Sequence, residues 1–235
     1  MPSPGTLPPG LRVYAVGDIH GCADALDALH GLMADDAAHA PEARRVVVYL
    51  GDYVDRGPDS RGVIERLIPP PRFGAEPVHL AGNHEAMMLD ALHRPDDATA
   101  VDLWVNNGGA MALSSWGISA YDDAPVTWPR AIPKNHLGFL LSLRRRATFG
   151  SYLFVHAGIR PGIALDAQSA DDLLWIREPF LSSMADHGAV VVHGHTPGRE
   201  VVVRPNRIGL DTGAVFGGPL SCAVFWADRM MILQA

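Results

Sequence analysis

The sequence predicts an α/β protein with parallel strands, two sheets and a helical insert. Three observations support this fold class. A strand, a glycine-containing loop and a helix follow one another three times between residues 12 and 93. The middle of the chain, about 95–145, is helical and aromatic, and the remainder is rich in short apolar runs of β type. Polar side chains also follow the strands, where open α/β sheets place their sites.

The three repeats are built in the same way. Each begins with a short apolar run, which the turns GDIHG at 17–21, GDYVDRG at 51–57 and GNHE at 82–85 then interrupt. Leucine and methionine recur at helical spacing after the first turn, and PPPR at 69–72 ends the second helix. The strands are expected over 12–16, 46–50 and 77–81, and the helices over 23–33, 60–68 and from the third turn to about 93.

The rest of the chain shows no linker between domains and no internal repeat. Residues 1–10 are rich in proline and glycine and are expected to form a flexible tail. Residues 11–235 are expected to form a single domain with a helical insert at about 95–145. Later strands are expected over 152–156, 190–193, 200–204, 208–210, 222–226 and 230–233.

The composition excludes several classes of protein. The 235 residues are 48% hydrophobic and 19% charged, with a net charge of −7, so no basic face for nucleic acid is expected. No apolar stretch is long enough for a membrane span, and the first residues do not resemble a signal peptide. Cys22 and Cys222 are far apart and do not suggest a disulfide framework. A cytoplasmic protein is therefore expected, without a nucleic-acid or membrane partner.

Polar side chains follow five of the expected strands, each time beside glycine. They are Asp18 and His20 after the first strand, Asp52, Asp55 and Arg56 after the second, Asn83 and His84 after the third, and His156 and His195 after two later strands. One such motif is a weak signal, because a single Asp-x-His turn or a lone histidine is more often structural. A turn-forming role does not explain their repetition at successive strand ends. We therefore expect these side chains to form a metal site.

The donor types restrict the metal chemistry. Met88 stands where an HExxH motif would need its second histidine, and the phosphate-loop motif GxxxxGK[ST] is absent. Carboxylates and imidazoles without a thiolate favour manganese, iron or zinc over copper or an iron–sulfur cluster. Six oxygen and nitrogen donors, namely Asp18, His20, Asp52, Asn83, His156 and His195, are too many for one open catalytic ion. They suit two ions that share a bridging ligand.

In combination, GDIHG, GDYVDRG, GNHE, HAG and GHT closely resemble the motifs of the PPP-type metallophosphoesterases. That family contains the bacterial and phage serine/threonine protein phosphatases and the symmetrical diadenosine tetraphosphate hydrolases. The resemblance covers residues 12 to about 218. It implies a calcineurin-like sandwich of four layers, in which helices flank two central mixed β-sheets and the metals lie at one rim.

The resemblance also implies a role for each matching residue. Asp18 and His20 would hold the first metal, Asp52 would bridge to the second, and Asn83, His156 and His195 would complete the second. His84 would be the general acid, Asp55 would orient it, and Arg56 and Arg177 would bind the phosphate. The cofactors would be two divalent ions, with manganese expected and iron or zinc as alternatives.

The activity implied is that of a dinuclear-metal-dependent phosphomonoesterase, in which a metal-bridging hydroxide attacks phosphorus directly. A serine/threonine protein phosphatase is favoured, with a phosphoprotein or a small phosphoester as substrate. The alternatives are a hydrolase of diadenosine tetraphosphate and a non-catalytic module that binds phosphoproteins. Trp104, Trp116 and Trp128 have apolar neighbours and are expected to be buried rather than to stack on a base.

Overall fold

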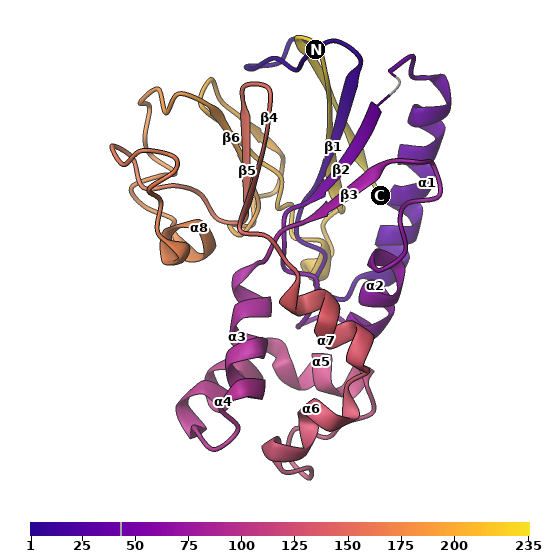
Figure 1. Cartoon of the computed structure of the whole chain (residues 1–235), viewed down its shortest axis with the longest axis vertical. Coiled ribbons are helices and arrows are strands. Elements are labelled where there is room, and N and C mark those ends of the chain that lie inside the picture. The colour runs from indigo at the N-terminus through magenta and orange to yellow at the C-terminus, as the bar shows by residue number, and fades with distance from the viewer. Residues whose placement is uncertain (43) are drawn as a thin grey trace.

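The computed structural model describes residues 1–42 and 44–235, and its strands form two mixed sheets (Figure 1). The first sheet has the order β10 (Arg229–Gln234), β9 (Ser221–Trp226), β1 (Leu11–Val16), β2 (Arg44–Tyr49) and β3 (Glu76–His79). The second has the order β4 (Arg146–Phe149), β5 (Tyr152–Val155), β6 (Val190–His193), β8 (Arg207–Gly209) and β7 (Val202–Val203). In each sheet three neighbouring strands are parallel, namely β1, β2 and β3 in the first and β5, β6 and β8 in the second. In the first sheet β9 is antiparallel to both β1 and β10, and in the second β4 and β7 are antiparallel to their neighbours.

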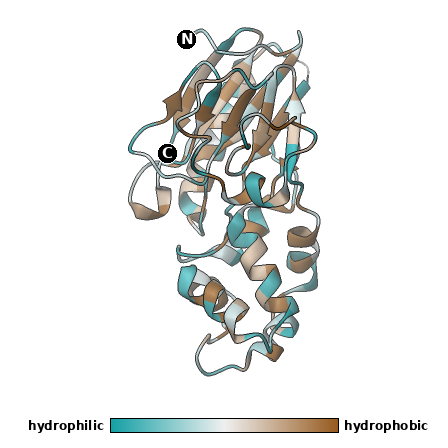
Figure 2. Ribbon diagram, turned by 90° about the vertical axis from the view of Figure 1, so that its left-hand side faces the viewer, coloured by the Kyte–Doolittle hydropathy of each residue, from teal (hydrophilic) through white to brown (hydrophobic). Residues whose placement is uncertain are grey.

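Apolar side chains pack on both faces of each sheet. Residues of β1 alternate, so that Val13 and Ala15 face the second sheet while Tyr14 and Val16 face the helices α1 (Ala23–His39) and α2 (Ser60–Leu67). The outer face of the second sheet packs against α8 (Ala170–Trp175) and the loops beside it. Much of the hydrophobic sequence accordingly lies in the strands, which carry most of the brown in the upper part of Figure 2. This confirms the expected sandwich of two mixed sheets flanked by helices.

The helical insert lies at one end of the two sheets, below the strand ends in Figure 1. After α3 (Asn83–His93) it contains α4 (Ala98–Trp104), a π turn (Val105–Gly109), α5 (Ala110–Ser115), a 3-10 turn (Pro125–Thr127), α6 (Trp128–Ala131) and α7 (Lys134–Leu141). Trp104, Trp116 and Trp128 are buried within it, as expected. The rings of Trp104 and Trp128 meet edge to face, with their centroids 5.9 Å apart.

The structure differs from the expected elements in three places. Helix α1 continues to His39, because the segment after Met33 is rich in alanine, which favours the helix although it adds little apolar periodicity. Strand β4 was not expected from the sequence. It lies at the edge of the second sheet with alternate residues exposed, so its sequence has no apolar run. The strand expected over 200–204 is reduced to β7, the other edge strand.

Residues 1–10, for which the sequence predicts a flexible tail, contact the turn between β9 and β10 and the turn between β4 and β5, where the N–H of Ser151 donates to the carbonyl of Thr6. The N–H groups of Ser3 and Leu7 donate hydrogen bonds to the carbonyl groups of Asp228 and Ala227, and the side chain of Leu7 is buried. Among the described residues, none of the helices has both the length and the apolar character needed to cross a membrane.

Candidate metal centre

The six expected metal ligands come together at the rim where the parallel strands of both sheets end. They are Asp18, His20, Asp52, Asn83, His156 and His195, and all six are buried. The loops after β1, β2, β3, β5 and β6 supply them. Parallel strands have their carboxyl ends at the same edge of a sheet, and the two sheets face each other, so five loops that are distant in sequence converge.

Asp52 is the centre of this cluster. Its Oδ2 atom lies 3.4 Å from Nε2 of His20, and its Oδ1 atom lies 3.4 Å from Nε2 of His156. The Nδ1 atoms of these two imidazoles face the carbonyl oxygens of Val54 and Leu50, at 2.8 and 2.9 Å. Hydrogen bonds from Nδ1 fix the ring orientations and direct each Nε2 lone pair towards Asp52.

Asn83 lies on the side of His156. Its Oδ1 atom is 2.9 Å from Nε2 of His156 and 2.9 Å from Nδ1 of His195. One amide oxygen and two imidazole nitrogens therefore meet beside the Oδ1 atom of Asp52. This is a compact set of four donors for one divalent cation.

Asp18 is a buried carboxylate with other carboxylates close to it. Its carboxylate accepts a hydrogen bond of 2.9 Å from the backbone N–H of His195. Burial and the negative charges of Asp211 and Asp52 raise the pKa of Asp18 well above its ordinary value. A cation in this place would relieve the repulsion and keep the carboxylate ionised.

The donor atoms fit a pair of divalent cations. Two sets of ligand atoms overlap at Asp52, namely His20, Asp52 and His84 on one side and Asp52, His156 and His195 on the other, and the atoms of each set lie within 4.8 Å of one another. Burial lowers the pKa of His20 to about 4 and that of His195 to about 3, so both rings are neutral and can bind a metal.

The backbone around the donors adopts left-handed conformations that residues other than glycine rarely use. Of the six such residues that the structure describes, five are in this cluster, with φ of 45° at His20, 52° at Asp52, 72° at Asp55, 64° at Arg56 and 65° at His195. Strained backbone of this kind is held by surrounding contacts and is concentrated at functional sites.

One close approach also requires glycine. A Cβ atom on Gly194 would lie 1.9 Å from Oδ1 of Asp18, so no other residue leaves room for that carboxylate. The glycine of the GHT motif thus has a steric role in addition to its place in the turn.

Glu85 was not expected as part of the site, yet it holds the Asp52 loop in place. Its Oε1 atom accepts hydrogen bonds from the backbone N–H groups of Tyr53 and Val54, and its Oε2 atom from those of Asp52 and Gly82. The sequence signal is a glutamate at the third position of a helix, where it can bond back to the residue before the helix. That pattern predicts the Gly82 bond but not the other three.

His84 and Asp55 are hydrogen-bonded, which is the arrangement that the family resemblance implies for them. Nδ1 of His84 donates to Oδ2 of Asp55 over 2.7 Å, while Nε2 of His84 lies 4.0 Å from Oδ2 of Asp52. Burial by itself would lower the pKa of His84, but the two carboxylates outweigh burial and raise it. The cationic form, which can donate a proton, is thereby favoured.

Arg56 contacts the cluster, and Arg177 lies at its exposed rim. Nη1 of Arg56 is 2.8 Å from Nε2 of His20, and its guanidinium carbon is 5.7 Å from the centre of the Phe216 ring. Arg177 follows α8 on the exposed rim, close enough for its charge to contribute to the lowered pKa of His195. Arg56 therefore reaches the donors directly, whereas Arg177 is linked to them through the effect of its charge on His195.

Two exposed aromatic side chains border the site, and sequence reasoning identified neither. Phe216 is 67% exposed beside Arg56, and Trp175 is 43% exposed with its ring edge-on to His195 at 6.3 Å between centroids. Their neighbours in the sequence are mixed, so no pattern indicates their exposure.

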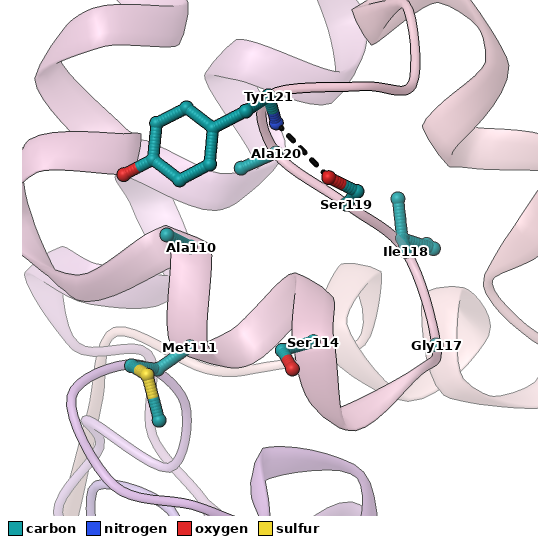
Figure 3. Close-up of a pocket in the computed structure, with 8 residues that line it drawn as sticks. All are labelled: Ala110, Met111, Ser114, Gly117, Ile118, Ser119, Ala120 and Tyr121. Carbon is teal, nitrogen blue, oxygen red and sulfur yellow. Dashed lines mark hydrogen bonds between the residues drawn. The ribbon is translucent and has the colours of Figure 1, made fainter.

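A hollow lies away from the cluster, in the insert, between α5 and the loop 117–121 (Figure 3). Its volume is about 580 Å³, and Met111, Ile118 and Tyr121 are among its lining residues. None of the expected site residues lines it. The chemistry of the donor cluster, rather than the size of this hollow, identifies the candidate site.

His193, two residues before His195, has structural partners. The imidazole of His193 is buried against the ring of Phe180, and its Nε2 atom is 3.3 Å from Nη1 of Arg207. These contacts indicate that His193 packs in the core rather than binding a metal.

Comparison with known proteins identifies phosphoesterases as relatives of this chain. The family described as calcineurin-like phosphoesterase matches residues 11–218. Serine/threonine-protein phosphatase 1 of Salmonella typhimurium is 32% identical over 220 residues, which is 90% of this chain and 91% of that protein. A symmetrical bis(5'-nucleosyl)-tetraphosphatase of Acidovorax is 30% identical over 64% of this chain and 45% of its own length. A solved structure, described as that of a candidate diadenosine tetraphosphatase, covers 95% of this chain and 93% of its own with a TM-score of 0.65 and 27% identity.

Proposed function

The chain belongs to the calcineurin-like phosphoesterase family, and on this basis we propose that it is a serine/threonine protein phosphatase with a manganese pair. The observation that carries the proposal is the position of Asp52, whose two oxygens face Nε2 of His20 and Nε2 of His156 at 3.4 Å each. A carboxylate with an imidazole on either side is suited to bridge two cations. The proposed ligands are Asp18, His20 and Asp52 for one ion, and Asp52, Asn83, His156 and His195 for the other.

Manganese is proposed because the donors mix carboxylate and amide oxygens with imidazoles and include no thiolate. When bound, two divalent ions supply an activated water and polarise the phosphoryl oxygens. The chain's own residues would do the rest. Arg56 and Arg177 would hold the phosphoryl oxygens, preferably through paired hydrogen bonds. The location is proposed to be cytoplasmic, since both cysteines are free thiols.

His84 would donate the proton that the leaving oxygen needs. Its Nε2 atom faces the cluster, and its Nδ1 atom is held by Asp55. The alkoxide of serine or threonine is a poor leaving group, so this proton transfer would contribute about 10²- to 10⁴-fold to the rate. A monoester of a protein hydroxyl is therefore within the chemistry of the site.

The choice of a protein substrate rests on the similarity to serine/threonine-protein phosphatase 1, which extends over nine-tenths of the chain. Hydrolysis of a dinucleoside polyphosphate is the second candidate, and one observation favours it. Trp175 and Phe216 present exposed aromatic faces at the rim, where an adenine could stack.

The test compares kcat/KM for a phosphothreonine peptide and for diadenosine tetraphosphate under the same manganese loading. The proposal expects the peptide to be preferred. A preference of about a hundredfold for the dinucleotide, or about 2.7 kcal/mol, would replace it by the second candidate. Hydrolysis of p-nitrophenyl phosphate with and without manganese forms the control. Failure to hydrolyse any of the three substrates, with metal bound, would indicate a binding module instead.

A further inference from the structure

The acid–base pair of His84 and Asp55 has a third member in the helical insert. The indole Nε1 of Trp104 donates to both carboxylate oxygens of Asp55, at 2.9 Å to Oδ1 and 3.1 Å to Oδ2. Trp104 and Asp55 are both fully buried. Trp104 therefore fixes the plane of the same carboxylate that orients the imidazole of His84.

The backbone around Trp104 is shaped for this contact. The π turn that begins at Val105 contains Gly108, whose φ is 111° and whose carbonyl accepts a hydrogen bond of 3.2 Å from the N–H of Arg56. A Cβ atom on Gly109 would lie 2.7 Å from the Trp104 ring. One turn of the insert thus holds the loop of Asp55 and Arg56 through both a side chain and the backbone.

The geometry explains what the indole contributes. His84 can rotate about its side-chain bonds unless the partner of its Nδ1 atom is itself fixed. The backbone of Asp55 is in the left-handed conformation. Among the described residues, its carboxylate accepts hydrogen bonds only from His84 and Trp104. Without the indole, the carboxylate keeps one donor and can turn away from the position that aims Nε2 of His84 at the cluster.

We infer that Trp104 is a positioning residue for proton transfer to the leaving group, acting through Asp55 and His84. The inference rests on the proposed phosphomonoesterase function. It predicts a dependence on the leaving group that a merely structural tryptophan would not have. Departure of 2,4-dinitrophenolate needs no proton, whereas departure of a threonine alkoxide does.

The experiment uses Trp104→Phe, which keeps an aromatic ring and removes the N–H donor. Trp116→Phe is the matched control, because Trp116 is buried in the same insert and donates instead to Nδ1 of His136, at 3.2 Å. Values of kcat are measured for a phosphothreonine peptide and for 2,4-dinitrophenyl phosphate with manganese bound. We expect Trp104→Phe to lose about 10-fold with the peptide and less than about 2-fold with the aryl ester. The ratio of the two rates should be unchanged in the control.

A second comparison tests whether Trp104 acts through His84. In a His84→Asn background, Trp104→Phe should have no further effect on hydrolysis of the peptide, because the group it positions is absent. Equal losses with both substrates, or an undiminished effect in that background, would overturn the inference. If wild-type protein hydrolyses neither substrate, the proposed function fails instead, so the two failures are distinguishable.

A measurement on folded protein covers the case in which Trp104→Phe does not fold. The zinc-loaded wild-type protein should show an indole N–H resonance for each of its five tryptophans. Asp55→Asn should move one of them upfield, because an amide oxygen is a weaker acceptor than a carboxylate. If all five resonances stay in place, Trp104 does not bond to Asp55 and the inference is wrong.

Discussion

Replacing Glu85 by glutamine should test how the Asp52 loop is held. The carboxylate accepts hydrogen bonds from four buried backbone N–H groups, at 2.8 Å from Asp52, 2.7 Å from Tyr53, 3.2 Å from Val54 and 2.8 Å from Gly82. Each oxygen serves two of them. Glutamine keeps one acceptor oxygen and turns an NH₂ group towards the other two donors, whichever way the amide is oriented.

The structure sets the size of the effect. An unpaired buried donor costs about 1–3 kcal/mol, so two of them should cost about 2–6 kcal/mol. For a chain of this length each kcal/mol lowers the unfolding midpoint by about 2–4 °C, so a decrease of at least about 4 °C is expected. Because the same groups support a proposed metal ligand, the metal affinity should also fall by about 10- to 100-fold.

The assay is thermal unfolding at pH 8, followed by circular dichroism, together with metal binding in competition with a chelator. Burial and the charge of Asp52 raise the pKa of Glu85 to about 7, and pH 8 keeps its carboxylate ionised. Glu65→Gln is the control, because Glu65 is exposed and its carboxylate bonds only to Arg61 among the described residues, at 2.9 Å. If the two variants unfold within about 1 °C of each other, the four hydrogen bonds do not hold the loop as argued.

Four further substitutions have distinct expected results. Asp52→Asn should lose metal as well as rate because both proposed ions share its carboxylate, whereas His84→Asn should lose about 10²- to 10⁴-fold in kcat and retain both metals by elemental analysis. Gly194→Ala should reduce metal content without unfolding the protein, because its Cβ atom would displace the Asp18 carboxylate. Burial lowers the pKa of His79 from 6.5 to about 4, so its contribution to stability is complete above pH 6.5 and is lost as the pH falls towards 4. His79→Phe should therefore lessen the loss of stability between pH 7 and pH 5 by about 1–2 kcal/mol, measured by urea unfolding.

Specific outcomes would contradict these predictions. Loss of metal from His84→Asn would show that His84 is a metal ligand rather than the general acid. The test is needed because the ring nitrogens of His84 lie within 4.8 Å of donor atoms of His20 and Asp52. Full metal content in Gly194→Ala would show that Asp18 is not required for binding. An unchanged pH slope in His79→Phe would mean that other groups account for the acid sensitivity.

The three strand–loop–helix repeats were predictable because their signals are local. Apolar runs with turn residues behind them define β1, β2 and β3 within a few residues of their ends. Elements without such a pattern were missed. Strand β4 has alternate residues exposed at a sheet edge, and the later part of α1 is alanine-rich, so neither carries the apolar periodicity that indicates an element.

The gathering of the six donors was also contained in the sequence, by an indirect route. Each donor follows a strand, and the carboxyl ends of parallel strands share one edge, so recognising the strands is enough to place Asp18, Asp52 and Asn83 together. That His156 and His195 join them from the second sheet follows from the two sheets facing each other across one core.

The tertiary structure alone determined the contacts between single residues that are far apart in the sequence. Trp104 is 49 positions from Asp55, and Glu85 is 33 from Asp52, and in both cases a side chain reaches one particular group in a different loop. Periodicity reports which face of an element is buried, but it does not report which polar group meets an N–H or a carboxylate there. The exposure of Trp175 and Phe216 is of the same kind, because it depends on what the surrounding loops leave uncovered rather than on the residues beside them in the chain.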